Sequence, residues 1–299
     1  MNTGIWYGIA AYVAWGLLPL YWKQIEQVSA GQLIGHRIVW SFLMLAAVTS
    51  LSAQWTALRE AVGRPGVVRS YALAAVLITI NWFIYVWSVN SGFIVETSLG
   101  YFINPLVSVV FGVLVFGERL RRLQWLAVTL AAAGVLYLTL AYGALPWISL
   151  VLALSFGTYG LVKKKAPLGS MHGLTVETAI LLVPAVLYLV YVERAGDGAF
   201  VHRGLSVDGL LVSTGLVTTV PLLMFASAVQ RTPLSTIGVL QYIAPTLQLL
   251  LGVFVYAEPF THTQFIGFAI VWAGLIVFGL DGVLSRRVPM AAIIDEGAG

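Results

Sequence analysis

The sequence predicts an all-α membrane protein with ten transmembrane helices, arranged as two inverted five-helix repeats with the N- and C-termini in the cytoplasm. Three observations predict this fold. Hydrophobic residues make up 60% of the 299 residues and charged residues only 9%, far below the roughly 25% of an average soluble domain. The apolar residues come in long blocks, and features of the first half recur in the second half 140 residues later.

Each apolar block has about the 20 residues that an α-helix needs to cross a hydrocarbon layer roughly 30 Å thick. The first block lacks a basic n-region and a small-residue cleavage pattern, so we expect it to remain as a helix and not to be a signal peptide. Blocks six and seven have the least sharp boundaries. In chain order, the blocks lie at residues 4–22, 32–52, 70–90, 94–117, 123–141, 145–162, 172–192, 208–229, 233–256 and 263–284.

The net charge of +4 comes from basic residues placed as topology anchors. With the N-terminus in the cytoplasm, most of them fall in short inward-facing loops, as the positive-inside rule describes. The inward-facing set is Arg59, Arg64, Arg69, Arg119, Arg121, Arg122, Lys163, Lys164, Lys165, Arg231, Arg286 and Arg287, and the outward-facing set is Lys23, Arg37, Arg194 and Arg203. This placement argues against a nucleic-acid partner. The expected partners are the lipid bilayer and a small-molecule substrate.

The repeats are predicted to be residues 1–141 and 142–285, followed by a cytoplasmic tail at 286–299. Pro245 of the second copy aligns with Pro105 of the first. Because five spans is an odd number, the second copy enters the membrane from the opposite side. Inverted repeats are typical of secondary transporters, which bind substrate near the midplane between halves that rock about it. A duplication that merely enlarged the bundle is the alternative interpretation.

Each proline-containing span carries one stripe of polar and small residues at helical spacing. A proline in a transmembrane helix frees a carbonyl one turn earlier, which requires a partner from a neighbouring helix, a side chain or cavity water. We therefore predict that the stripes line a central substrate-binding cavity, with Asn104 and Tyr242 at its flanks. Hydrogen bonding between helices is the alternative. The stripes are Tyr101, Pro105, Ser108 and Gly112, and Gln241, Pro245, Gln248 and Gly252.

The third span adds a second candidate binding surface. Asn81 and Tyr85 share one helical face, and Trp82 lies beside it. Aromatic rings supply contact area while amide and hydroxyl groups give directional contacts, so this surface suits a substrate with an apolar body and a polar end. The equivalent positions in the second half hold Pro221 and Phe225, with Thr218 a turn earlier, which predicts an asymmetric site. A lipid-facing aromatic belt is the alternative for the tryptophans.

The first span of each half is predicted to bend. At an offset of 141, residues 15–23 align with residues 156–164. Small residues and prolines allow close helix approach and bending, although ordinary packing explains them almost as well. The predicted hinges are Gly16, Pro19, Pro105, Gly157, Gly160, Pro221 and Pro245, the predicted gates are Tyr21 and Tyr159, and Trp15 is assigned to substrate binding.

Few charges fall inside the spans, and an ionised group in hydrocarbon normally faces a partner or water. Arg37 and Glu177 occupy equivalent repeat positions near opposite membrane faces, so we expect no direct bond between them. Arg37 and Glu96 are a candidate gate or proton-coupling pair, with helix-end anchoring as the alternative for all three residues. Glu118 and Glu258 follow the proline spans, and we predict that they anchor the turns to the next helices.

The sequence carries no signature of catalysis. The HExxH, GxSxG and GxxxxGK[ST] motifs are absent, as is a conspicuous intramembrane carboxylate pair. The chain has no cysteine, which excludes disulfide and thiolate chemistry. We therefore expect no enzyme activity, no cofactor and no metal. A membrane-embedded lipid-modifying enzyme is the alternative from a different functional class.

Several stretches of the chain resemble a known family. They include "AYVAWGLLPLYWK", "NWFIYVWSVN", "SLGYFINPLVSVVFG" and "LQYIAPTLQLLLGV". These stretches are similar to the RarD-type proteins, associated with chloramphenicol sensitivity, of the EamA branch of the drug/metabolite transporter superfamily. The resemblance covers residues 1 to 285, nearly the whole chain.

The resemblance implies a central cavity lined by the first, third and fourth helices of each half. Relatives include YddG-like exporters of aromatic and other amino acids, and exporters of small drugs. We accordingly expect a plasma (inner) membrane exporter of small amphiphilic metabolites, led by hydrophobic or aromatic amino acids. Drug efflux is the second candidate. Because one chain holds both halves, we expect a monomer to suffice.

Overall fold

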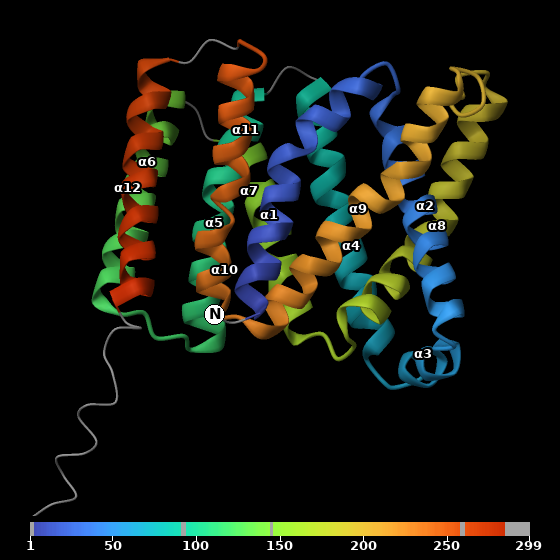
Figure 1. Cartoon of the computed structure of the whole chain (residues 1–299), viewed down its shortest axis with the longest axis horizontal. Helices are drawn as coiled ribbons and strands as arrows, with labels where there is room; N and C mark the ends of the chain where they lie inside the picture. The colour runs from blue at the N-terminus through green and yellow to red at the C-terminus, as the bar shows by residue number, and fades with distance from the viewer. Residues whose placement is uncertain (1–2, 91–93, 144–145, 258–260, 285–299) are drawn as a thin grey trace, which may run out of the picture.

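A computed structural model describes residues 3–90, 94–143, 146–257 and 261–284. All regular secondary structure in these ranges is helical, which confirms the all-α prediction (Figure 1). The elements are α1 (Thr3–Trp22), η1 (Lys23–Ile25), α2 (Ala30–Leu51), α3 (Trp55–Val62), α4 (Val67–Asn90), α5 (Ile94–Phe116), α6 (Arg122–Tyr142), α7 (Trp147–Lys165), α8 (Ser170–Arg194), α9 (Leu205–Arg231), α10 (Leu234–Leu240), α11 (Ile243–Phe254) and α12 (His262–Leu284).

Within the described ranges, nine helical segments are long and apolar enough to cross a membrane, with α10 and α11 together forming one of them. The helix α7 is not among the nine. It coincides with the sixth predicted block but ends in three consecutive lysines, which lower its mean hydropathy. The composition of the helices therefore establishes a multi-pass membrane protein and leaves the tenth span as a prediction.

Helices from the two halves of the chain interlock. The helices α6 and α12 run together along one end of the molecule, and α2 and α8 form the other end (Figure 1). The remaining contacts come in equivalent pairs: α1 packs on α9 as α7 packs on α4, and α7 packs on α5 as α1 packs on α11. Neither half therefore has a core of its own, because each helix buries its face against the other half.

Glycines bring α6 and α12 into close contact. A Cβ atom on Gly134 would lie 2.8 Å from the carbonyl oxygen of Gly267, and one on Gly274 would lie 2.7 Å from that of Ala127. Gly134 and Gly274 align at the 140-residue offset. Small residues allow helix backbones to approach closely in a membrane, so the same device serves both helices of this pair.

The two proline spans differ in continuity. The helix α5 continues through Pro105, whereas the predicted span 233–256 is interrupted at Gln241 and Tyr242, between α10 and α11. Pro245 has no N–H to donate to the carbonyl of Gln241. The N–H of Ala244 donates to that carbonyl at 3.2 Å instead, which tightens the chain at the interruption.

Candidate functional site

An aromatic cluster lies where α1, α7 and α9 meet. The ring of Trp15 lies 5.7 Å from that of Phe156 and 5.6 Å from that of Phe225, measured between centroids. Tyr159 stacks on Phe225 from the other side, at 6.0 Å and an interplanar angle of 12°. Trp15, the residue assigned to substrate binding in α1, is thus packed against the other half and is partly exposed.

The polar stripes of α5 and α10 are in direct contact. The Ser108 hydroxyl donates to Oε1 of Gln241 at 2.8 Å, and both side chains are buried. Farther along, Nε2 of Gln248 donates to the carbonyl oxygen of Trp15 at 3.2 Å. In this conformation the Ser108 and Gln241 side chains bridge the two helices, with no chamber separating this pair.

The flanking residues Asn104 and Tyr242 have different surroundings. Oδ1 of Asn104 is buried and has no hydrogen-bond partner among the described residues. The Tyr242 hydroxyl donates to the carbonyl oxygen of Phe102 at 3.1 Å. Together with Pro105, Tyr242 lines a narrow apolar crevice that separates α5 and α10 from α6 and α12. Pro105 and Tyr242 therefore border the crevice, whereas Asn104 does not.

At the predicted residues, the third span, α4, forms hydrogen bonds to another helix and an aromatic contact. Nδ2 of Asn81 donates to the carbonyl oxygen of Leu152 at 2.9 Å and to the hydroxyl of Ser155 at 3.0 Å, both on α7. Tyr85 meets Tyr101 of α5 edge to face, with ring centroids 5.8 Å apart, and their hydroxyls are hydrogen-bonded. In this structure Asn81 therefore bridges two helices, and its role in substrate binding stays a prediction.

The predicted hinge glycines are sites of close helix packing. A Cβ atom on Gly16 would lie 2.7 Å from Leu247, and one on Gly157 would lie 2.6 Å from Val107. Both the glycines and their contacts are equivalent between the halves. The other predicted hinges also lie within helices: Pro19 in α1, Pro105 in α5, Gly160 in α7, Pro221 in α9 and Pro245 in α11. Bending at these positions stays a prediction.

Tyr21 connects α1 to α9. Its hydroxyl donates to the carbonyl oxygen of Leu210 and lies 2.8 Å from the hydroxyl of Ser213. The other predicted gate, Tyr159, donates to Oε2 of Glu177 at 3.1 Å. Both tyrosines thus connect the first helix of one half to another helix, and gating by either stays a prediction.

Arg37 lies in an aromatic setting. Its Nε donates to the Thr218 hydroxyl at 2.9 Å. The guanidinium carbon lies 4.2 Å from the ring centroid of Trp82 and 5.1 Å from that of Trp22, both within the range of cation–π attraction. Three tyrosines lie within electrostatic range of the guanidinium: Tyr21, Tyr85 and Tyr101.

No carboxylate of the described residues lies within ion-pair distance of Arg37. The side chain of Glu96, the predicted partner of Arg37, lies outside the described residues.

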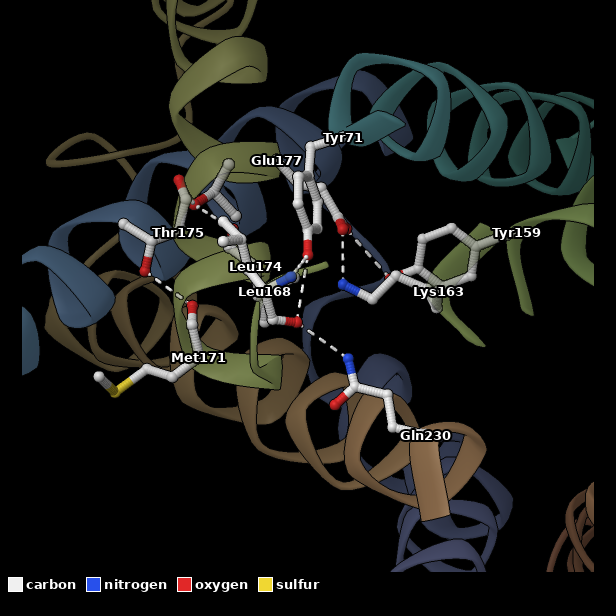
Figure 2. Close-up of polar contacts among 10 residues, drawn as sticks. Tyr71, Tyr159, Lys163, Leu168, Met171, Leu174, Thr175, Glu177 and Gln230 are labelled. Carbon is white, nitrogen blue, oxygen red and sulfur yellow. Dashed lines mark hydrogen bonds and ion pairs between the residues drawn. The ribbon is translucent and has the colours of Figure 1, made fainter. Parts of the chain in front are cut away.

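Glu177, at the equivalent position in the second half, has a cation of its own (Figure 2). Its Oε1 lies 2.5 Å from Nζ of Lys163, and the two side chains are only 2% and 1% exposed. Lys163 also lies over the rings of Tyr71, at 5.4 Å, and Tyr159, at 5.8 Å. The prediction that Lys163 is a loop anchor is wrong: its side chain turns into the protein from the last turn of α7 and neutralises Glu177.

Tyr71, a member of the same cluster, forms hydrogen bonds to Leu168, which precedes the start of α8. The Tyr71 hydroxyl accepts from the backbone N–H of Leu168 at 2.9 Å and donates to its carbonyl oxygen at 3.2 Å. That carbonyl also accepts from Nε2 of Gln230 on α9, at 3.0 Å (Figure 2). The α7–α8 connection is thus held by α4 and α9.

Glu118 lies in the connection between α5 and α6, as predicted, but its carboxylate has its hydrogen-bond partners in another helix. It accepts from the backbone N–H groups of Leu234 and Ser235 at 2.6 and 2.8 Å, and from the Ser235 hydroxyl at 2.7 Å. Nζ of Lys164 lies 3.7 Å away. The carboxylate therefore binds the first turn of α10, in the other half, and the prediction of a local turn anchor is wrong. Glu258 lies outside the described residues.

A narrow cavity lies between α2, α4, α8 and α9, with room for about one water molecule. Apart from Leu174, its lining consists of residue pairs related by the 140-residue offset. The pairs are Arg37 and Glu177, Ile38 and Thr178, Ser41 and Leu181, Ile78 and Thr218, and Trp82 and Leu222. Arg37 and Glu177 are not bonded to each other, as expected, although both line this one cavity.

Two residues of the site were missed by sequence reasoning, Tyr71 and the inward-turned Lys163, whereas Thr218 was named without its partner. Only Lys163 carries a signal, because it follows Tyr159 by four residues and so shares its helical face. The sequence contains nothing that pairs Thr218 with Arg37, since 181 residues separate them. Within the described residues, no group of three or more potential metal-binding side chains occurs.

Apolar helices that enclose a buried ion pair, an arginine and a cavity between two equivalent halves define a multi-pass membrane protein built by duplication. The EamA-like transporter family matches each half, at residues 2–140 and 145–280. The chain therefore belongs to the EamA-like transporter family, as a RarD-type member.

Two relatives and one solved structure illustrate the match. "Protein RarD" of Streptomyces exfoliatus is 46% identical over 286 residues, which cover 96% of this chain and 91% of the relative. "Chloramphenicol-sensitive protein RarD" of Pseudomonas aeruginosa is 31% identical and covers 96% of both chains. A crystal structure with 20% identity has a TM-score of 0.69 and covers 95% of this chain and 98% of its own, which supports the fold.

Proposed function

We propose that this EamA transporter is a secondary transporter that exports small amphiphilic metabolites by alternating access, with hydrophobic and aromatic amino acids as the leading substrates. The plasma (inner) membrane is the proposed location, and a single chain is proposed to be sufficient. Two matched halves support this mechanism, because exchanging the shapes of two similar units converts an outward-open cavity into an inward-open one.

The proposed architecture has ten spans, with α7 as the tenth, in inverted halves at residues 1–141 and 142–285. The equivalent packing of α1 on α9 and of α7 on α4 supports this division. The start of α1, the short helix α3 and the end of α12 lie on one side of the bundle (Figure 1), which supports placing both termini in the cytoplasm.

One observation carries the proposal: five pairs of equivalent residues line the same cavity between the halves. A site at a pseudo-two-fold axis is where transporters with inverted repeats bind substrate. Because the cavity has room for about one water molecule, we assign this structure to a closed conformation. In an open conformation, the aromatic rings of Trp82 and Trp15 would contact the apolar body of a solute.

The test is uptake into proteoliposomes of a panel of labelled amino acids and chloramphenicol, with and without an imposed pH gradient. We expect saturable movement of unchanged hydrophobic or aromatic amino acids, and none into protein-free liposomes. Accumulation that depends on the pH gradient would establish proton coupling. Failure to move any solute of the panel would contradict the proposal.

Drug efflux is the second candidate, favoured by the name of the Pseudomonas aeruginosa relative. Saturable movement of chloramphenicol, without movement of the amino acids, would select this function. A lipid-modifying enzyme would instead convert a lipid to a new product when the detergent-purified protein is supplied with that lipid.

A further inference from the structure

Arg37 is a cation without a carboxylate partner among the residues whose side chains are described. Of its donors, Nε is bonded to Thr218, and no described carboxylate lies within ion-pair distance of the guanidinium. The side chain is only partly exposed, between the rings of Trp22 and Trp82. A charge inside a membrane is costly unless it meets a partner or water, so an uncompensated arginine here indicates a binding role.

Comparison of the halves shows where the first half lacks an equivalent of the Lys163–Glu177 pair. In the second half, Glu177 is neutralised by Lys163. At the offset of 141 that aligns the first spans, the residue equivalent to Lys163 is Trp22. The position equivalent to that of Lys163 thus supplies an aromatic ring to Arg37, and the charges described around the shared cavity sum to one net positive charge.

We propose that Arg37 binds a carboxylate, or another singly charged anionic group, of the transported solute. The inference rests on the proposed transport function and adds the charge class of the substrate. A guanidinium presents paired N–H donors that match a carboxylate in bidentate geometry. The stacked Trp82 ring and the bond to Thr218 orient the guanidinium, so little rotational freedom is lost on binding.

The surrounding tyrosines extend the same site. Tyr21, Tyr85 and Tyr101 all lie within electrostatic range of Arg37. The Tyr21 hydroxyl already donates to Leu210, and one hydroxyl of the Tyr85–Tyr101 pair donates to the other, so the remaining hydroxyl of that pair is the one able to donate to a bound anion. The apolar remainder of the solute would contact the ring of Trp82, which also lines the cavity. The site therefore selects an amphiphile with an anionic end over its uncharged counterpart.

A matched pair of probes tests the charge: 3-phenylpropionate and 3-phenylpropionamide, which differ only in the ionised group. Binding to the full chain in phosphatidylcholine nanodiscs is measured by calorimetry. We expect the wild-type protein to bind the acid about tenfold more tightly than the amide. Equal affinities in the wild type would overturn the inference, and this comparison needs no variant.

Variants then test whether the preference for the acid depends on the charge of Arg37. Arg37→Gln is expected to remove the preference for the acid, and Arg37→Lys is expected to retain part of it. Arg59→Gln, at an exposed position on α3, is the matched control and is expected to retain the full preference. A monodisperse, cooperatively unfolding Arg37→Gln protein that keeps the preference would overturn the assignment to Arg37.

The same anion chemistry is present in lipid headgroups, so a second arm replaces part of the phosphatidylcholine with phosphatidylglycerol. Unchanged affinity for the acid supports a solute site. A loss of affinity that Arg37→Gln abolishes would assign the site to a lipid and overturn the solute assignment. In proteoliposomes, transport of the acid and the amide at equal rates refutes only this inference. If no solute of either charge is moved, the proposed transport function fails instead.

Discussion

Arg37 and Glu177 occupy equivalent positions in the two halves, yet their charges have different described neighbours. Glu177 forms a buried ion pair with Lys163 and accepts a bond from Tyr159. Arg37 has aromatic rings and one neutral hydroxyl as neighbours. The difference teaches that duplication preserves the positions of spans and glycines but not the charge at the interface, so the two sides of one cavity acquire separate roles.

The largest effect is expected from Lys163→Met, which leaves Glu177 buried without a cation. Breaking one partner of a buried pair costs about 3–5 kcal/mol. The measurement is the unfolding free energy of the detergent-purified protein. The double variant Lys163→Met/Glu177→Gln is expected to recover much of the loss, because no buried charge remains. Lys165→Met, at the exposed neighbouring position, is the control; if it costs as much as Lys163→Met, the contrast between the halves fails.

A second carboxylate, Glu118, extends the comparison. It accepts hydrogen bonds from backbone N–H groups and also lies near Lys164. Glu118→Gln removes the charge from the bonds to Leu234 and Ser235, and we expect a loss of about 1.5–3 kcal/mol of unfolding free energy. Thermal and chemical unfolding measure it. Glu60→Gln, exposed on α3, is the control. An unchanged stability would mean that Glu118 does not hold α10 to the first half.

Trp22→Glu tests whether the difference between the two halves depends on having no carboxylate at position 22, the position equivalent to Lys163. The variant places a carboxylate beside Arg37, as Lys163 is placed beside Glu177. It is expected to weaken binding of 3-phenylpropionate about tenfold, or ~1.4 kcal/mol, while binding of the amide changes little. Trp22→Phe, which keeps an aromatic ring, is the control. Undiminished acid binding by the glutamate variant would separate Trp22 from the site.

The smallest effect is expected from Thr218→Val, which removes the hydroxyl that accepts from Nε of Arg37. One neutral hydroxyl is worth about 1 kcal/mol, so acid binding should fall several-fold. Thr219→Val is a matched control on the same helix, because the Thr219 hydroxyl is buried and has no partner among the described residues. That change is expected to leave stability equal or slightly higher. An equal loss of binding in both variants would remove Thr218 from the site.

The sequence predicted much of the fold because membrane spans are encoded locally. Block length and hydropathy place each helix, and the aligned glycines Gly134 and Gly274 indicate the close packing found between α6 and α12. The interruption between α10 and α11 was not predicted. Pro105 and Pro245 are equivalent in the sequence, and only the neighbours of each proline decide whether the helix stays continuous.

The candidate site was predicted less completely. The sequence identified Arg37 and Glu177 as intramembrane charges but assigned Lys163 to a loop and Glu118 to a local turn. Both errors have one cause: a long charged side chain at a helix end is able to reach either solvent or the protein interior, and the sequence pattern is the same for both. Which of the two directions the side chain takes depends on the residues that surround it in the folded protein.

The sequence by itself determined the solvent of this protein, its helices, its duplication and the rare charges within its spans, since all of these follow from composition and periodicity along the chain. The tertiary structure alone decided which of those charges is neutralised. Compensation depends on contacts between helices 14 to 181 residues apart in sequence, as in the Lys163–Glu177 and Arg37–Thr218 pairs. Such contacts exist only once the helices have packed against one another.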